Sequence, residues 1–194
     1  MRKIILLLFI SFYSIVSSSQ IFDFKDKPIP PYQDAVAVNG IREEMTRVDE
    51  YLLNNAPQLQ PMKIVMDTVI NGNIYVQQKI NSVSYGYVDN KLSRLTVIVN
   101  NGLTDSGTLH DVLNNPSHVI NFYFDSSGLI SIIERYTNQS RMGSCGTVTI
   151  IKSLYYQGHK ILWHSIEQNP YHCYSENIVV NYYAAIMKKL NIEF

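Results

Sequence analysis

Apolar and polar residues alternate most clearly over residues 119–136. The alternating apolar positions are Ile120, Phe122 and Phe124, followed by Ile130 and Ile132. Side chains on a pleated strand point to opposite faces in turn, so a period of two predicts two strands that share an apolar face. Between them, Asp125 can accept hydrogen bonds from a turn backbone and Gly128 can take a positive φ. This stretch therefore predicts a β-hairpin.

The same pattern recurs on both sides of this hairpin. Residues 82–88 and 92–99 predict one pair of strands, and residues 147–156 and 160–167 predict another. Residues 62–80 predict two further strands around Asn71 and Gly72, because Asn-Gly readily adopts the positive φ angles of a tight turn. Together these segments predict an antiparallel β-meander of about eight strands.

Three of these turns share an aromatic pair before the turn and a Leu or Ile after it. The sets are Tyr85/Tyr87 with Leu92, Phe122/Phe124 with Leu129, and Tyr155/Tyr156 with Ile161. The recurrence resembles the Tyr-and-Gly hairpin repeats of MORN-type proteins, but its spacing is irregular and the Gly pattern of those repeats is missing. We interpret it as a shared requirement of hairpins and not as homology.

Two segments carry apolar residues at helical spacing. The first begins at Asn39, a candidate N-cap, and ends near Asn55; the second begins at Ser175, also a candidate N-cap. Residues 108–113 predict a shorter helix. The long apolar faces are Ile41, Met45, Val48 and Leu52 in the first helix, and Ile178, Val179, Tyr182, Tyr183, Ile186 and Leu190 in the last. The predicted fold class is α+β, with the meander flanked by an N-terminal and a C-terminal amphipathic helix.

The first residues have the pattern of an export signal. Arg2 and Lys3 form a basic start, residues 4–16 are apolar but too short and too Ser-interrupted for a comfortable membrane span, and residues 17–19 are small. We expect a signal peptide over residues 1–19, a mature chain from about Gln20, and a periplasmic or extracellular location. An uncleaved N-terminal anchor is the alternative, and no membrane span is expected after signal cleavage.

Residues 20–38 are predicted to form an extended N-terminal arm. Pro28, Pro30 and Pro31 exclude a helix or an interior strand there, because proline lacks a backbone donor and restricts the residue before it. Residues 39–194 have the length of a single domain with a real core.

Charge weighs against nucleic acid as a partner. The chain has 16 Lys and Arg against 16 Asp and Glu, with a formal net charge of zero. No basic cluster stands out, whereas binding to nucleic acid depends on clustered Lys and Arg that neutralise phosphates.

Cys145 and Cys173 are predicted to form a disulfide. They are the two cysteines of the chain, and an exported protein folds in an oxidising compartment. The bridge would set where the C-terminal helix docks. Two free buried thiols are the alternative.

The sequence contains no strong catalytic, cofactor or metal motif. It has no phosphate-binding Gly-rich loop, no Gly-x-Ser-x-Gly and no His-Glu-x-x-His. Cys145 could be a thiol nucleophile with His164 or His172 as its base. A zinc site could be proposed from His164, His172, Cys145 and Cys173. A disulfide between the two cysteines competes with both hypotheses. We therefore assign no catalytic residue, no cofactor and no metal.

An aromatic cluster around the last hairpin is the candidate binding site. Tyrosine and tryptophan supply contact area together with a polar tip, although they also commonly fill cores. The period of two predicts Ile161 and Trp163 on one face and His164 on the other, as a hydrogen-bonded core residue. The candidate residues are Tyr155, Trp163, His164, Tyr171 and Tyr174.

These observations favour an exported, non-enzymatic protein that binds another protein, an envelope component or a small ligand. The alternative is an exported hydrolase with an unrecognised site. A concave pocket with converging polar groups would favour the hydrolase, and an exposed recognition surface would favour the binding protein.

Overall fold

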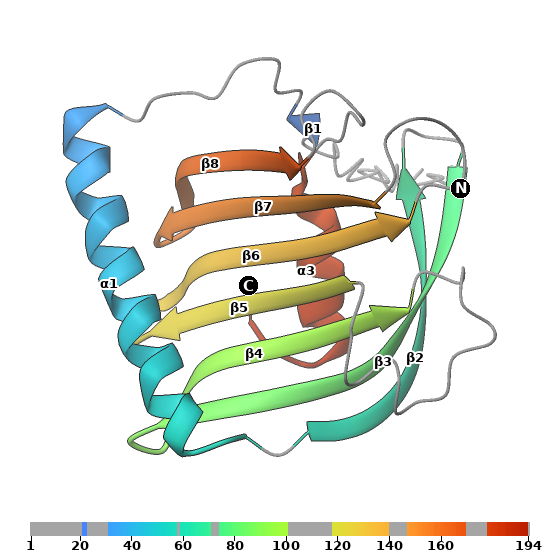
Figure 1. Ribbon diagram of the computed structural model, residues 1–194, viewed down its shortest axis with the longest axis horizontal. Helices are drawn as coiled ribbons and strands as arrows, with labels where there is room; N and C mark the ends of the chain where they lie inside the picture. The colour runs from blue at the N-terminus through green and yellow to red at the C-terminus, as the bar shows by residue number, and fades with distance from the viewer. Residues whose placement is uncertain are drawn as a thin grey trace, which may run out of the picture.

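The computed structural model describes residues 21–22, 31–57, 59–70, 74–100, 118–139, 147–169 and 178–193 (Figure 1). The elements in chain order are β1 (Ile21–Phe22), α1 (Tyr32–Asn54), β2 (Leu59–Ile70), β3 (Ile74–Val88), β4 (Lys91–Asn100), β5 (His118–Asp125), β6 (Gly128–Gln139), β7 (Thr147–Gln157), β8 (Lys160–Asn169), β9 (Ile178–Val179) and α3 (Val180–Lys189).

Strands β2 to β8 form one antiparallel sheet in chain order, and β1 pairs with β9 in a separate two-stranded sheet. The α+β class and the meander are therefore confirmed. Within the described residues the meander has seven strands, against the prediction of about eight. The segments predicted before and after Asn81 are one strand, because the register shifts between Ile80 and Ser82 without ending the ladder.

The turn of the β5–β6 hairpin follows its prediction. The side chain of Asp125 accepts hydrogen bonds from the backbone N–H and the hydroxyl of Ser127, both at 2.6 Å. Gly128 has a φ of 113°, which a residue with a Cβ rarely adopts. These local interactions explain why the turn is readable in the sequence.

Three hairpins of the meander share one irregularity. In each, the aromatic residue before the turn pairs with the Leu or Ile after it, and the register then shifts by one residue on the returning strand. The pairs before and after the shift are Tyr87↔Leu92 and Gly86↔Arg94, Phe124↔Leu129 and Tyr123↔Ser131, and Tyr156↔Ile161 and Tyr155↔Trp163. The recurrence in the sequence is thus a repeated β-bulge.

The bulge corrects a prediction about the faces of β6. Ile130 was expected on the same face as Ile132, but it packs in the cluster of Val48 of α1, whereas Ile132 packs in the main core.

The bulge also corrects a prediction about the faces of β8. Ile161 was expected beside Trp163, but it packs in the same core cluster as Ile166, while Trp163 pairs with Tyr155 on the other face. A strict period of two fails here because the bulge at Leu162 reverses the alternation.

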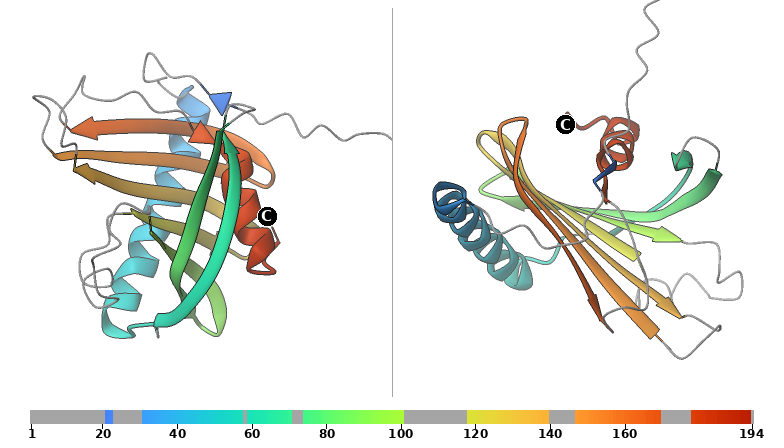
Figure 2. Two further views of the ribbon diagram at one scale, coloured as in Figure 1. Left: turned by 90° about the vertical axis from the view of Figure 1, so that its right-hand side faces the viewer. Right: turned by 90° about the horizontal axis from the view of Figure 1, so that it is seen from above.

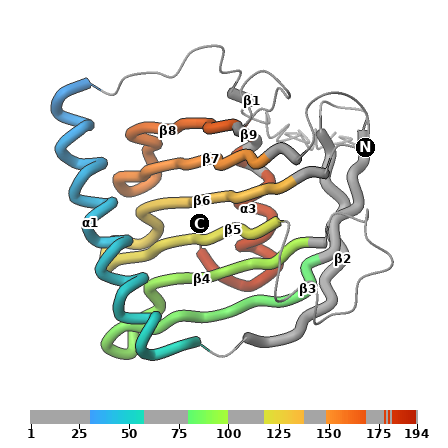
Figure 3. The backbone as a smooth tube through the Cα atoms, viewed as in Figure 1, coloured from blue at the N-terminus to red at the C-terminus, as the bar shows by residue number. Residues whose placement is uncertain are grey.

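The two helices lie on opposite sides of the sheet (Figure 2). Val48 and Leu52 of α1 pack in a small cluster with residues from β3, β5 and β6. Tyr183 and Ile186 of α3 pack in the main core with residues from β3 to β8. The main core lies between α3 and the sheet, and α1 crosses the hairpin ends on the other face (Figure 3).

Helix α1 begins at Tyr32, earlier than the predicted start at Asn39. Residues 32–38 are therefore helical and not part of an extended arm. Pro31 is compatible with this start because a proline beside the first turn removes no intrahelical hydrogen bond. Val38 is 2 % exposed, so tertiary burial favours the added turns.

The described helices include none that is both long enough and apolar enough to cross a membrane. The predicted signal peptide and the predicted helix at 108–113 lie outside the described residues.

Candidate functional site

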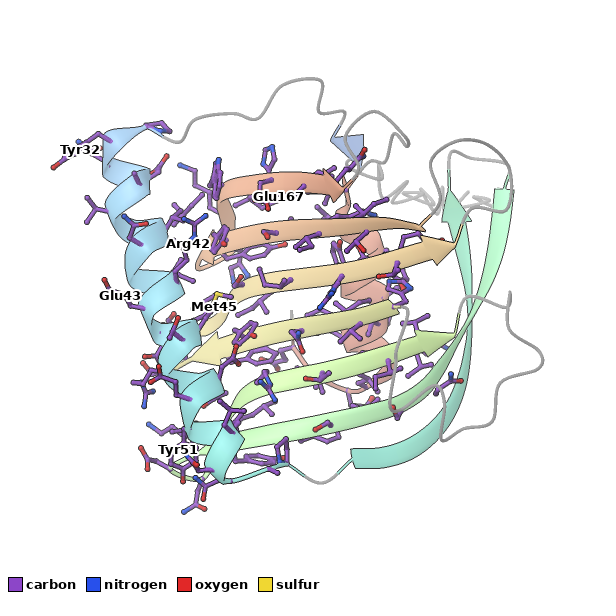
Figure 4. All side chains as sticks on the ribbon, in the orientation of Figure 1. Tyr32, Arg42, Glu43, Met45, Tyr51 and Glu167 are labelled. Atoms are coloured by element: carbon purple, nitrogen blue, oxygen red, sulfur yellow. The ribbon has the colours of Figure 1, made fainter. Side chains whose placement is uncertain are left out.

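Tyr155 and Trp163, two of the predicted binding residues, lie side by side on the α1 face of the sheet. Their rings stack with centroids 5.5 Å apart and planes 20° apart. The Cζ of Arg42 lies 5.2 Å from the Tyr155 centroid and 5.1 Å from the Trp163 centroid. Its Nε donates a hydrogen bond to the Tyr155 hydroxyl at 3.2 Å, and Figure 4 shows Arg42 reaching from α1 toward these strands. The pair therefore serves as a docking point for α1.

His164 lies on the opposite face from this pair. It is the cross-strand partner of Leu154, which belongs to the main core. Burial lowers the pKa of His164 from its ordinary value. The structure thus separates His164 from Tyr155 and Trp163. Tyr171, Tyr174, Cys145, Cys173 and His172 lie outside the described residues.

A buried ionic cluster, which we call the Glu134 cluster, lies between the sheet and α3. Glu134 on β6 is faced by His118 on β5, Lys152 on β7 and Tyr183 on α3. His118 Nε2 lies 2.5 Å from Oε1 of Glu134, the Tyr183 hydroxyl donates to Oε2 at 2.6 Å, and Lys152 Nζ lies 3.4 Å from Oε2. One carboxylate thus connects three strands and a helix.

Burial and charge act in opposite directions on Glu134. Burial by itself raises the pKa of a carboxyl group, because the charged form loses its hydration. The positive charge of Lys152, and the contacts with His118 and Tyr183, outweigh that effect and lower the pKa of Glu134 to about 2. Burial and the neighbouring carboxylate also raise the pKa of Tyr183 well above its ordinary value. Glu134 is therefore ionised and Tyr183 is neutral at neutral pH.

The sequence carries a signal for this cluster that the predicted site residues did not include. Glu134 follows Ile132 at an interval of two, so the alternation that predicted the hairpin also placed a carboxylate on its apolar face. A buried carboxylate needs a partner of opposite charge or a hydrogen-bond donor. The pairing register that brings Lys152 opposite Glu134 was not predictable from a single segment.

The Glu134 cluster contains acid–base groups but is sealed. The exposed fractions are 3 % for His118, 4 % for Glu134, 8 % for Lys152 and 1 % for Tyr183. A general acid or base must come within hydrogen-bond reach of its substrate. Across the described ranges, no group of three or more His, Cys, Asp or Glu side chains is arranged to hold a metal ion. The cluster can hold α3 against the sheet.

A second set of polar contacts connects α1 to the sheet. Asp49 accepts hydrogen bonds from the Tyr123 hydroxyl at 3.1 and 3.2 Å, and Arg94 Nη1 lies 2.7 Å from its Oδ1. The side chain of Asp49 is 44 % exposed. Unlike the Glu134 cluster, this set is in contact with solvent.

Beyond α1, the same face of the sheet carries polar side chains that are exposed or half-buried. Thr96 and Asn121 are cross-strand partners, and the Thr96 hydroxyl donates to Oδ1 of Asn121 at 2.7 Å. Among the described elements, α1 covers only the hairpin ends of this face (Figure 1). We call this set the polar strip; it consists of Thr96, Asn121, Arg135, Thr149 and Glu167, one from each of β4 to β8, with Ile133 and Ile151 between them on the same face.

Comparisons of the chain with protein-family models, with curated proteins and with solved structures find no match.

Proposed function

We propose that this chain is an exported, non-enzymatic protein that binds a partner through the polar strip. The observation that carries the proposal is the contrast between the two faces of the sheet. The face under α3 is covered by the helix and holds the main core and the sealed Glu134 cluster, whereas the face beside α1 presents polar groups from five neighbouring strands. A protein or an envelope component fits such a polar face better than a small ligand, which needs a concave site.

The chemistry of the polar strip supports recognition by hydrogen bonds. Thr96, Thr149 and Asn121 supply donors and acceptors, and Arg135 and Glu167 supply exposed charges of both signs. The strands hold the backbone of these residues at fixed spacing, so little backbone freedom is lost on binding.

The position of the Glu134 cluster weighs against the alternative of an exported hydrolase. His118 and Glu134 form an acid–base pair, but α3 covers it. Catalysis there would require the helix to move away from the sheet.

Export is tested first, by the mass of the protein recovered outside the cytoplasm. We expect a mature chain that begins near Gln20, since the predicted signal peptide ends at residue 19. A protein of full-length mass that stays with the membrane would contradict export by cleavage and support the uncleaved anchor.

Binding is tested by a photo-crosslinking amino acid placed at Asn121 or Thr149 in cells that export the protein. The matched control is the same substitution at Lys189, which is exposed on α3, on the other side of the sheet. We expect covalent adducts of one discrete mass from positions 121 and 149 and none from position 189. Equal adducts at all three positions, or none in the polar strip, would contradict the proposal.

A further inference from the structure

Two segments from opposite ends of the chain meet beside the start of α3. Strand β1 pairs antiparallel with β9, so that Ile21 is the partner of Val179 and Phe22 is the partner of Ile178. Strand β9 continues directly into α3 at Val180. The first strand of the chain is therefore held at the point where the last helix begins (Figure 3).

The start of α3 has no capping residue of the usual kind. The sequence predicts an N-cap at Ser175, but the helix begins at Val180 and follows Val179. Valine has no side-chain oxygen that could accept a hydrogen bond from the N–H groups of the first turn, and it is a poor N-cap residue. Other contacts therefore set where the helix starts, and the β1–β9 ladder directly precedes it.

The β1–β9 ladder and α3 share one core. Helix α3 has ten residues, fewer than an isolated helix needs to be stable in water, so it depends on tertiary contacts. Its residues Tyr183, Ile186 and Met187 are buried in the main core. Ile178 of β9 belongs to the same core and is fully buried. Whatever holds Ile178 in place therefore also holds the start of α3.

We propose that β1 is a clasp for α3: the first residues of the mature chain hold the start of the helix in the core, and their loss loosens α3 while the meander stays paired. The meander does not need β1, because β2 to β8 form a sheet of their own. Among the described strands, β9 alone pairs with β1. The loss of β1 therefore falls on the segment that leads into α3.

The clasp gives the N-terminal boundary of the mature chain a structural role. The predicted signal peptide ends at residue 19, and the ladder begins at Ile21. Cleavage near Gln20 leaves the clasp complete, whereas trimming to Asp23 removes it. This connection with processing rests on the proposed export, but the pairing itself does not. An uncleaved chain in which the clasp variants still loosen α3 would contradict export alone.

The test is amide hydrogen exchange of the purified protein with Ile21→Pro and Phe22→Pro combined. Proline has no backbone N–H, so this variant loses every donor of β1, whichever of the two residues donates to β9. We expect the protection factors of residues 184–189 to fall at least about tenfold, while the amides of β5 and β6 keep theirs. The matched control is Lys25→Pro with Asp26→Pro, which places two prolines outside β1 and should leave α3 as protected as in the wild type.

The single variants Ile21→Pro and Phe22→Pro decide if the double variant does not fold. In an antiparallel pair, only one of two successive residues donates its N–H to the partner strand. One single variant should therefore lower the protection of α3, and the other should serve as its control.

The proposal is overturned if α3 keeps its wild-type protection in the double variant or in both single variants, or if β5 and β6 lose protection together with α3. A fall in α3 protection when the wild-type protein is diluted would also overturn it, because the clasp would then come from a second copy of the chain.

Discussion

Gly86 shows how a single residue sets the distance between α1 and the sheet. It lies on β3 opposite Arg94, at the register shift, and a Cβ added there would lie 2.5 Å from Cδ1 of Leu52. Leu52 is 3 % exposed and packed, so its side chain has little room to move. The absence of a side chain at this position is what lets Leu52 reach the sheet.

We predict that Gly86→Ala lowers the free energy of unfolding by about 1–2 kcal/mol, because overpacking displaces Leu52. Chemical denaturation measures the change. The matched control is Gly40→Ala in α1, where an added Cβ meets nothing within 4 Å; it should stabilise the protein by about 0.5–1 kcal/mol through helix propensity.

The clash itself is tested by adding Leu52→Ala to Gly86→Ala. The double variant should be more stable than the sum of the two single effects predicts, because Ala at position 52 leaves space for the new Cβ. Strict additivity would show that Gly86 acts through its backbone conformation and not through contact with Leu52.

At the scale of elements, the repeated bulge explains why α1 can cross the sheet. In each of three hairpins, the first paired residue beyond the register shift, counted away from the turn, faces the helix. These residues are Gly86, Tyr123 and Tyr155. Gly86 accommodates Leu52, the Tyr123 hydroxyl bonds Asp49, and Arg42 bonds Tyr155. From Arg42 to Asp49 the helix rises about 10.5 Å. That rise is close to the distance across two strand spacings, about 9.6 Å, that separates β7 from β5.

We predict that Asp49→Ala destabilises the protein by about 0.5–1.5 kcal/mol, since it removes the acceptor for Tyr123 and the partner of Arg94 in a site that is partly screened by water. Urea denaturation measures the loss. In a Tyr123→Phe background the same substitution should cost less, because one of its two partners is already gone. An equal cost in both backgrounds would assign the effect to the contact with Arg94 and not to Tyr123.

At the scale of the whole molecule, the loops that carry the two cysteines leave the sheet from the same end. Gln139 at the end of β6 pairs with Thr147, and Asn169 at the end of β8 pairs with Thr149. The cysteines themselves lie outside the described residues, so the disulfide stays a prediction. The neighbouring exits of the two loops are compatible with it.

We predict that Cys145 and Cys173 are bridged in the exported protein, so that intact mass rises by two hydrogens on reduction. Replacing both by Ser should lower stability by about 3–4 kcal/mol, the chain-entropy value for a loop of about 28 residues. An unchanged mass after reduction under denaturing conditions would refute the bridge.

The features that the sequence predicted well are local. The hairpin turn at Asp125 and Gly128, the alternation on β5 and the apolar stripe of α1 each depend on neighbours within a few residues. The predicted last helix included Ile178 and Val179, but these residues pair with β1, and α3 begins at Val180. The features that it missed depend on partners far along the chain. Helix α1 begins at Tyr32 because Val38 is buried, and the bulge at Leu162 reverses the face of β8.

For the candidate site, too, some features follow from the sequence and others from the tertiary structure. The sequence by itself determined the α+β class and the meander, because period, turn chemistry and side-chain type are written in order along the chain. Only the tertiary structure decided that Trp163 and His164 face opposite ways and that Glu134 meets His118, Lys152 and Tyr183. The register between strands and the docking of α3 create those contacts, and both are set by packing between segments that are distant in sequence.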